Sequence, residues 1–196
     1  DYPFDETLDC RKKHQISSER IIFLSFGMID EKKNVVNIIK AASELPPQIA
    51  KKLCLLIVGK VRNTYKQALN EAIAEANQRQ PDLQITQEGR FVSDAEMESY
   101  VRQSNCISLA YINFYSSSGV IGLAARHNKP ILATQLGVVG KQTTEYGLGV
   151  TTDARDEKAI KNALESLLLN LALYPKNASG YVADHSPRAF MQQLLF

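Results

Sequence analysis

Three serines and a glycine stand where one apolar run ends and the next begins. Residues 115–122 read YSSSGVIG, after the strand-like run CISLAYI and at the start of the helix-like run VIGLAAR. Ser117 or Ser118 can cap that helix, and Gly119 lets a ligand approach the backbone. The unpaired amides at a helix N-terminus favour phosphate. A plain capping turn would use the same residues, so the stretch taken alone leaves both interpretations equally open.

A second stretch of this kind combines a glycine with two lysines. Residues 27–34, GMIDEKKN, place Gly27 at the end of an apolar run and Lys32 and Lys33 at the start of a predicted helix. Gly27 permits a sharp turn, and the helix dipole disfavours cations at that position unless an anion is present. The alternative, that both lysines are simply solvated, is favoured for this stretch taken alone.

A third stretch, TQLGVVGKQ at residues 134–142, places Gly137 and Gly140 between a buried strand and a helix-like run. Its amides would point into the same crevice as the first two stretches. Neither glycine pair fits G-x-G-x-x-G, and no G-x-x-x-x-G-K-[ST] occurs. The sequence therefore argues against a dinucleotide dehydrogenase or a kinase of those types.

Composition narrows the remaining classes. The 23 basic and 21 acidic residues give a net charge of +2, without a block of like charges, so we expect no nucleic-acid partner. No run is long and apolar enough for a transmembrane helix, and the first residues lack a signal-peptide pattern. The three histidines have no metal-ligand spacing, so we expect no metal and no cofactor. The three cysteines favour buried free thiols and a cytoplasmic location.

Strand-like and helix-like segments alternate over residues 20–172, which predicts an α/β fold with a mostly parallel sheet covered on both faces. Four apolar runs have the character of buried parallel strands, and two weaker strands follow the same pattern. These strands are expected at 21–27, 53–59, 106–112 and 130–134, with the weaker ones near 83–89 and 148–152. In such a sheet, ligands bind beyond the carboxyl ends of the strands.

The helices are indicated by apolar stripes and by capping residues. Stripes of helical period run over 34–45 and 65–78, with a capping box predicted from Thr64 and Gln67. A second capping box is predicted from Ser93 and Glu96.

Asp156 is predicted to cap a further helix, whose apolar positions extend to Leu171. We divide the chain into an N-terminal segment (1–19), a Rossmann-like domain (20–172) and a C-terminal part (173–196) with turns and a crossing helix. That helix is expected with Ser186 as its N-cap, Pro187 at its first position and its apolar positions at Phe190, Met191 and Leu194.

Taken in order, these segments resemble the C-terminal, donor-binding domain of a group 1 retaining glycosyltransferase with the two-domain GT-B fold. The resemblance runs through most of the chain. It rests on LSFGMIDEKKNVVNIIKAA, LLIVGK, EGRFVSDAEMESYVRQSNCISLAY, SSSGVIGLAARHNKPILATQLGVVGKQ and EYGLGVTTDARDEKAIKNAL. It implies a Rossmann-like three-layer parallel sheet that forms half of a GT-B enzyme, with the acceptor site in a missing N-terminal domain.

The resemblance also implies a donor site. In the family, a basic residue and a lysine five or six positions later hold the donor diphosphate. Lys33 matches the lysine, whereas Met28 stands at the basic position. The diphosphate would then lie between Lys33 and the amides of residues 117–119. The implied partner is a nucleoside-diphosphate sugar, and no catalytic residue is assigned.

Two family glutamates, eight positions apart, have no counterpart here. The alignment places Tyr115 and Leu123 at their positions, so Ser117, Ser118 and Gly119 would act as the local substitute. One lost carboxylate hydrogen bond to the ribose would weaken binding by about one to two decades.

Four other positions complete the implied site. Gly27 and Gly137 would leave room for the donor, and the nucleoside would lie near Phe91 and Val92. Two alternatives stay open. One is a degenerate domain that keeps the fold and serves as a binding or scaffolding unit. The other is a sugar-nucleotide epimerase or a phosphorylase, which share the two-domain architecture.

Overall fold

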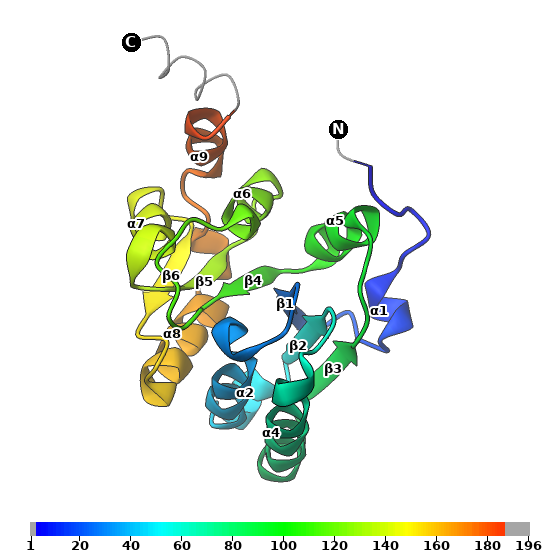
Figure 1. The fold of residues 1–196 in the computed structure, drawn as a ribbon. Coiled ribbons are helices and arrows are strands. Elements are labelled where there is room, and N and C mark those ends of the chain that lie inside the picture. The colour runs from blue at the N-terminus through cyan, green and yellow to red at the C-terminus, as the bar shows by residue number, and fades with distance from the viewer. Residues whose placement is uncertain (1–2, 187–196) are drawn as a thin grey trace.

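The computed structural model describes residues 3–186. Six parallel strands form one sheet in the order β3-β2-β1-β4-β5-β6, with helices on both faces (Figure 1). The strands are β1 (Ile21–Phe26), β2 (Leu53–Val58), β3 (Gln84–Glu88), β4 (Cys106–Leu109), β5 (Ile131–Thr134) and β6 (Gly149–Thr152). This confirms the predicted Rossmann-like three-layer fold.

The helices divide between two hydrophobic layers. One layer packs under α2 (Val35–Ser43), α4 (Lys66–Arg79) and α8 (Glu157–Leu169). The other packs under α1 (Cys10–Lys13), α5 (Asp94–Gln103), α6 (Gly119–Arg126), α7 (Gly137–Glu145) and α9 (Ala178–Asp184). The short α3 (Pro47–Ala50) leads into β2, and three 3-10 turns occur at Glu31–Lys33, Asn63–Tyr65 and Leu171–Leu173.

Some strands have a strongly apolar sequence and others a weak one because central strands are more deeply buried than edge strands. β1 pairs with β2 from Ile21↔Leu53 to Phe26↔Val58, and every residue of β2 is buried. The edge strands β3 and β6 are mostly half-buried, so fewer of their residues need to be apolar. Chain order reverses between β1 and β4, which is where the ligand crevice of such a sheet is expected.

Most of the predicted helix caps are confirmed. The side chain of Ser93 accepts from the Glu96 amide at 3.2 Å, and the Glu96 carboxylate accepts from the Ser93 amide at 2.9 Å. Asp156 accepts from the amides of Lys158 and Ala159 at the start of α8. The helix ends at Leu169 and Leu171 begins a separate 3-10 turn, so the predicted helix was too long at this end.

The capping box predicted from Thr64 and Gln67 is wrong. Thr64 lies inside the 3-10 turn that precedes α4, and the N-cap residue of α4 is Tyr65, without a side-chain cap. The Gln67 amide donates instead to Glu71 at 2.9 Å, one helical turn further along.

The region after Tyr174 holds a helix that the sequence pattern did not predict. Asn177 caps α9 by accepting from the Gly180 amide at 3.1 Å, and Ala178 and Tyr181 are buried against the layer that contains α6. Because α9 is short and buries only these two residues, its sequence shows little of the apolar periodicity by which a helix can be predicted. The closing helix predicted at Pro187–Leu194 lies outside the described residues.

Candidate functional site

The loops after β1 and β4 are fastened to each other at the point where strand order reverses. Asn34 Nδ2 donates to the carbonyls of Ala110 at 3.0 Å and Ala154 at 2.7 Å. The Ile112 amide donates to the Lys32 carbonyl at 3.1 Å. These bonds take the backbone of residues 110–112 out of the sheet, which explains why β4 ends at Leu109 and not at residue 112 as predicted.

The loop after β1 turns as predicted but holds its lysines differently. Gly27 has a φ of +102°, which only glycine adopts without strain. Asp30 caps the 3-10 turn Glu31–Lys33 by accepting from the Lys33 amide at 3.3 Å. Lys32 and Lys33 therefore precede α2 and are not in its first turn, because Asn34 separates them from that helix in a left-handed conformation.

The Lys33 ammonium is enclosed by the chain. Its Nζ donates to the Tyr111 hydroxyl at 2.7 Å and lies 4.4 Å from the centre of the Tyr111 ring. A Cβ placed on Gly27 would lie 3.5 Å from Nζ, so the missing side chain makes room for the ammonium. Burial lowers the pKa of Lys33 to about 8, against the opposing influence of Asp30. A half-buried ammonium with one hydroxyl partner is well suited to bind an anion.

Tyr111 connects this ammonium to the serine stretch. Its side chain is 3% exposed. Burial raises the pKa of Tyr111 to about 12, and a side-chain hydrogen bond from Ser118 opposes that rise. Tyr111 thus interacts with both Lys33 and Ser118, which brings two of the sequence-predicted site residues into one cluster.

The serine stretch forms the N-terminus of α6. Ser118 is its N-cap, since Ser118 Oγ accepts from the Val120 amide at 3.4 Å. Ser117 and Gly119 are exposed, and a Cβ on Gly119 would meet no atom within 4 Å. Free space therefore adjoins the first amides of an eight-residue helix, the local geometry that anions use at helix N-termini.

Gly137 has a structural reason to be glycine that differs from the predicted one. Its φ is +68°, and a Cβ there would lie 2.5 Å from Tyr115 Cα. The Val138 amide also donates to the Tyr115 carbonyl at 3.1 Å. The space beside Gly137 is thus filled by the serine loop itself, so this glycine fixes the loop in place.

The two positions predicted near the nucleoside lie just before α5. Phe91 is 79% exposed and Val92 half-buried, ahead of α5. Between α5 and α6 lies a cleft of about 520 Å³, lined among others by Phe26, Met97 and Leu123. Leu123, which stands where the family has its second glutamate, is 7% exposed and gives this cleft an apolar wall.

A second cleft adjoins the serine stretch on its other side. It measures about 470 Å³ and is lined by residues of α6, α7 and α9 and by residues next to these helices, including Ser117, Ser118 and His185. His185 stacks on Tyr181 with ring centroids 4.1 Å apart, and its Nε2 lies 2.9 Å from Gln142 Nε2. Both clefts share Gly119, so the N-terminus of α6 opens into each of them.

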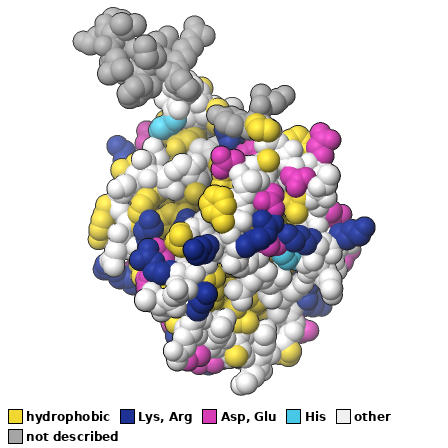
Figure 2. All heavy atoms as spheres, turned by 45° about the vertical axis from the view of Figure 1, so that its right-hand side comes forward, with side chains coloured by type: hydrophobic (Ala, Val, Ile, Leu, Met, Phe, Trp, Pro, Cys, Tyr) yellow, Lys and Arg dark blue, Asp and Glu magenta, His cyan; other side chains and the backbone are white. Residues whose placement is uncertain are grey.

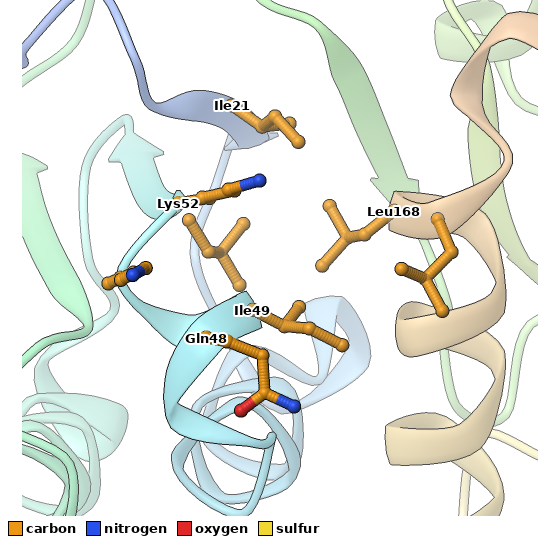
Figure 3. A pocket seen from close by; sticks show the side chains of 8 residues that line it. Ile21, Gln48, Ile49, Lys52 and Leu168 are labelled. Atoms are coloured by element: carbon orange, nitrogen blue, oxygen red, sulfur yellow. The ribbon is translucent and has the colours of Figure 1, made fainter.

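A further pocket lies far from these loops. It measures about 430 Å³ and is lined by Ile21, Ile49, Lys52 and Leu168 among others, at the amino ends of β1 and β2 (Figure 3). Because ligands of open parallel sheets bind at the carboxyl ends, we assign this pocket no part in the site.

The surface carries charges of both signs. Figure 2 shows Lys and Arg side chains in a band across one face, with Asp and Glu side chains beside it. Ion pairs account for part of this mixture: Glu88, at the end of β3, accepts from Lys13 at 2.5 Å and from Arg90 at 2.7 Å. These bonds fix the segment that leads to Phe91.

Other predictions concern thiols, metals and membranes. Cys10, Cys54 and Cys106 are buried free thiols, as expected. Over residues 3–186, no three His, Cys, Asp or Glu side chains gather into a group that could hold a metal ion. Within the same residues, every helix is too short or too polar to span a membrane.

Sequence reasoning missed Tyr111 and Asn34. The apolar run 106–112 predicts a buried strand that contains Tyr111, although a buried tyrosine needs a partner for its hydroxyl and so signals a polar neighbour. The helical stripe predicted at 34–45 begins at Asn34, whereas asparagine is among the residues that most readily adopt the left-handed conformation seen here.

The fold and these loops define a Rossmann-like domain with a candidate anion site at its topological switch point. The chain belongs to the family described as glycosyl transferases group 1, whose sequence profile matches residues 7–179. No curated protein matches the sequence. The predicted membership of this family is thus confirmed.

Solved glycosyltransferase structures share the fold. Sucrose-phosphate synthase from Thermosynechococcus elongatus superimposes with a TM-score of 0.69 at 18% identity, covering 89% of this chain and 43% of the other. HepE of Anabaena, solved in complex with UDP and glucose, gives a TM-score of 0.72 at 14% identity, covering 94% and 49%. The chain thus spans less than half the length of each of these proteins.

Proposed function

We propose that this chain is the nucleotide-sugar-binding half of a retaining glycosyltransferase, which transfers a sugar from a nucleoside-diphosphate donor to an acceptor. The observation that carries the proposal is the cluster at the switch point. Lys33 Nζ, which lies beside Gly27, donates to the Tyr111 hydroxyl, and Ser118, the N-cap of α6, hydrogen-bonds to the same tyrosine. The presence of UDP in the HepE structure supports a uridine donor as the first to test.

The diphosphate would lie between Lys33 and the amides of residues 117–119, with the nucleoside toward Phe91 and Val92. Each contact of an amide or ammonium with a charged oxygen contributes about 1.5–3 kcal/mol. In the transfer step, the same groups would stabilise the negative charge that develops on the departing nucleoside diphosphate. Gly27 would contribute by admitting the ammonium, and Gly137 by holding the serine loop.

The acceptor site, and any general base, would belong to an N-terminal domain of the full-length protein. Five large apolar side chains are exposed near the carboxyl ends of the strands, which supports a partner domain at this edge: Met28, Phe91, Tyr115, Leu136 and Val138. We further propose a cytoplasmic location, because three buried thiols stay unpaired.

One alternative has a specific observation in its favour. Leu123 is 7% exposed and part of a hydrophobic cluster, so the position of the family's second glutamate has become core. A degenerate domain that serves as a binding or scaffolding unit would tolerate that change, and it would bind no nucleotide.

Nucleotide titration tests the proposal. The ¹⁵N-labelled chain is titrated with UDP, GDP and ADP while amide resonances are followed by NMR. We expect shifts centred on residue 33 and residues 117–119 for one nucleotide. No response to any of the three at millimolar concentration would favour the degenerate domain.

A pair of neighbouring lysines provides the matched control. Lys33→Met removes the enclosed ammonium and should weaken nucleotide binding by about one to two decades. Lys32→Met removes the same charge from an exposed side chain whose Nζ lies 5.2 Å from the Phe114 ring centre, and should change binding by less than about threefold. Equal losses of nucleotide affinity in both variants would mean that Lys33 acts only through general positive charge and forms no specific site.

A further inference from the structure

The Tyr111 hydroxyl occupies a position that neither the strand pattern nor core packing explains. It lies at the end of β4 with its ring buried, yet its oxygen accepts from Lys33 Nζ at 2.7 Å. Ser118, the N-cap of α6, also interacts with this side chain, since a hydrogen bond from Ser118 opposes the rise in the pKa of Tyr111. The one tyrosine is therefore in contact with the cation of the first loop and with the residue that caps the helix of the second.

The two loops are joined independently of this hydroxyl. Asn34 bonds the carbonyl just before Tyr111, and the Lys32 carbonyl accepts from the amide just after it. The Tyr111 ring also packs edge-on against Phe114, with centroids 5.2 Å apart. Replacing the hydroxyl with hydrogen would leave these contacts in place, so the loops do not depend on it for their position.

Resting on the donor-binding function proposed above, we propose that Tyr111 is a positioning residue of the diphosphate site. Its hydroxyl holds the Lys33 ammonium over Gly27 and orients it toward the N-terminus of α6, so that the cation and the helix amides face one anion before it arrives. This pre-organisation replaces part of what the family obtains from the basic residue that is Met28 here. Preformed sites bind more tightly because less ordering is left to binding.

The electrostatic surroundings of Lys33 fit this role. The acidic group that acts on it is Asp30, which is partly neutralised by Arg62 at 3.2 Å, while Lys32 on the same loop adds positive charge. Since no carboxylate is bonded to Lys33 Nζ within the described residues, the Tyr111 hydroxyl is the hydrogen-bond acceptor that favours the charged form.

The first test measures Lys33 without any nucleotide. The ¹³Cε resonance of Lys33 is followed between pH 6 and 11 in the wild-type chain and in Tyr111→Phe. Because Phe keeps the ring and removes only the acceptor, the pH at the midpoint of the Lys33 titration should fall by about one unit. An unchanged midpoint would overturn the inference, whether or not nucleotide binds.

The second test measures UDP affinity by calorimetry at several pH values between 6 and 9. Tyr111→Phe should weaken binding about tenfold at pH 7 and should shift the alkaline loss of affinity to lower pH. Tyr65→Phe is the control, since it removes another buried hydroxyl, which accepts from the Val36 amide at 3.0 Å in the opposite helical layer. Its UDP affinity and pH profile should match those of the wild-type chain.

The outcomes separate the two proposals. If the wild-type chain binds UDP and Tyr111→Phe binds equally well with the same pH profile, the positioning role is wrong and the donor-binding function stands. If the wild-type chain binds no nucleotide, the donor-binding function fails, and the role of Tyr111 in positioning an anion site fails with it.

Discussion

At the scale of single residues, Lys33 lies in surroundings that oppose its charge. Burial lowers its pKa from the ordinary value of 10.5 to about 8, and Asp30 only partly offsets this. A residue chosen for stability alone would not be a lysine here, since an unbranched apolar side chain such as that of methionine could fill most of the same space without a charge. A half-buried cation that lowers the stability of the fold is typical of a functional position.

This predicts a stability gain in Lys33→Met. At pH 7 the folded chain holds a proton that its interior disfavours, so the variant should be more stable by about 1–3 kcal/mol. Between pH 8 and 10.5 the unfolded chain keeps the proton that the folded chain has released, so the stability of the wild type should rise toward that of the variant.

Urea unfolding of both chains at several pH values between 7 and 10 measures the difference. Comparing the two chains cancels the contributions of other groups that titrate in this range. A stability difference that is zero at pH 7, or that does not narrow with rising pH, would contradict the account of Lys33.

Residue-scale predictions from the sequence were best where one side chain acts on its own backbone, although the capping box at Thr64 and Gln67 failed because a 3-10 turn precedes α4. The caps at Ser93, Ser118 and Asp156 are of that kind, since each needs only its own helix. The roles of Tyr111 and Gly137 depend on loops that are distant in the sequence, and no local pattern specifies those contacts.

At the scale of elements, one asparagine joins three segments. Asn34 is 2% exposed, has a φ of 61°, and ties the loop after β1 to the ends of β4 and β6 through the carbonyls of Ala110 and Ala154. The separation of Lys33 from α2 follows from this conformation. Helix periodicity could predict α2 to within a few residues, but it could not predict that the preceding turn is 3-10.

Asn34→Ala should therefore lower the free energy of unfolding by about 2–4 kcal/mol, because two buried carbonyls lose their donor and alanine resists the left-handed conformation. Asn128→Ala is the matched control: Asn128 has a φ of 50° but is exposed, so the loss should be near 1 kcal/mol. Thermal or urea unfolding provides both values. Equal losses would mean that the two hydrogen bonds of Asn34 contribute nothing beyond backbone conformation.

At the scale of the whole molecule, the parallel sheet and its two helical layers could be predicted because the strand runs are apolar and evenly alternate with helices. The edge that carries the candidate site is also where Met28, Phe91 and Tyr115 stay exposed. The sequence predicted that the loops after β1 and β4 face one crevice, but it could not show that Lys33 bonds to Tyr111, since 78 positions separate the two residues. Only the reversal of strand order between β1 and β4 brings them together.

The central claim is that the crevice between these two loops takes the diphosphate of a nucleotide donor. A crystal structure of the chain with UDP tests this most directly. We predict phosphate oxygens within hydrogen-bond distance of Lys33 Nζ and of an amide among residues 117–119, with the uracil toward Phe91. Density for UDP elsewhere, such as the pocket at the amino ends of β1 and β2, with this crevice unoccupied, would contradict the account.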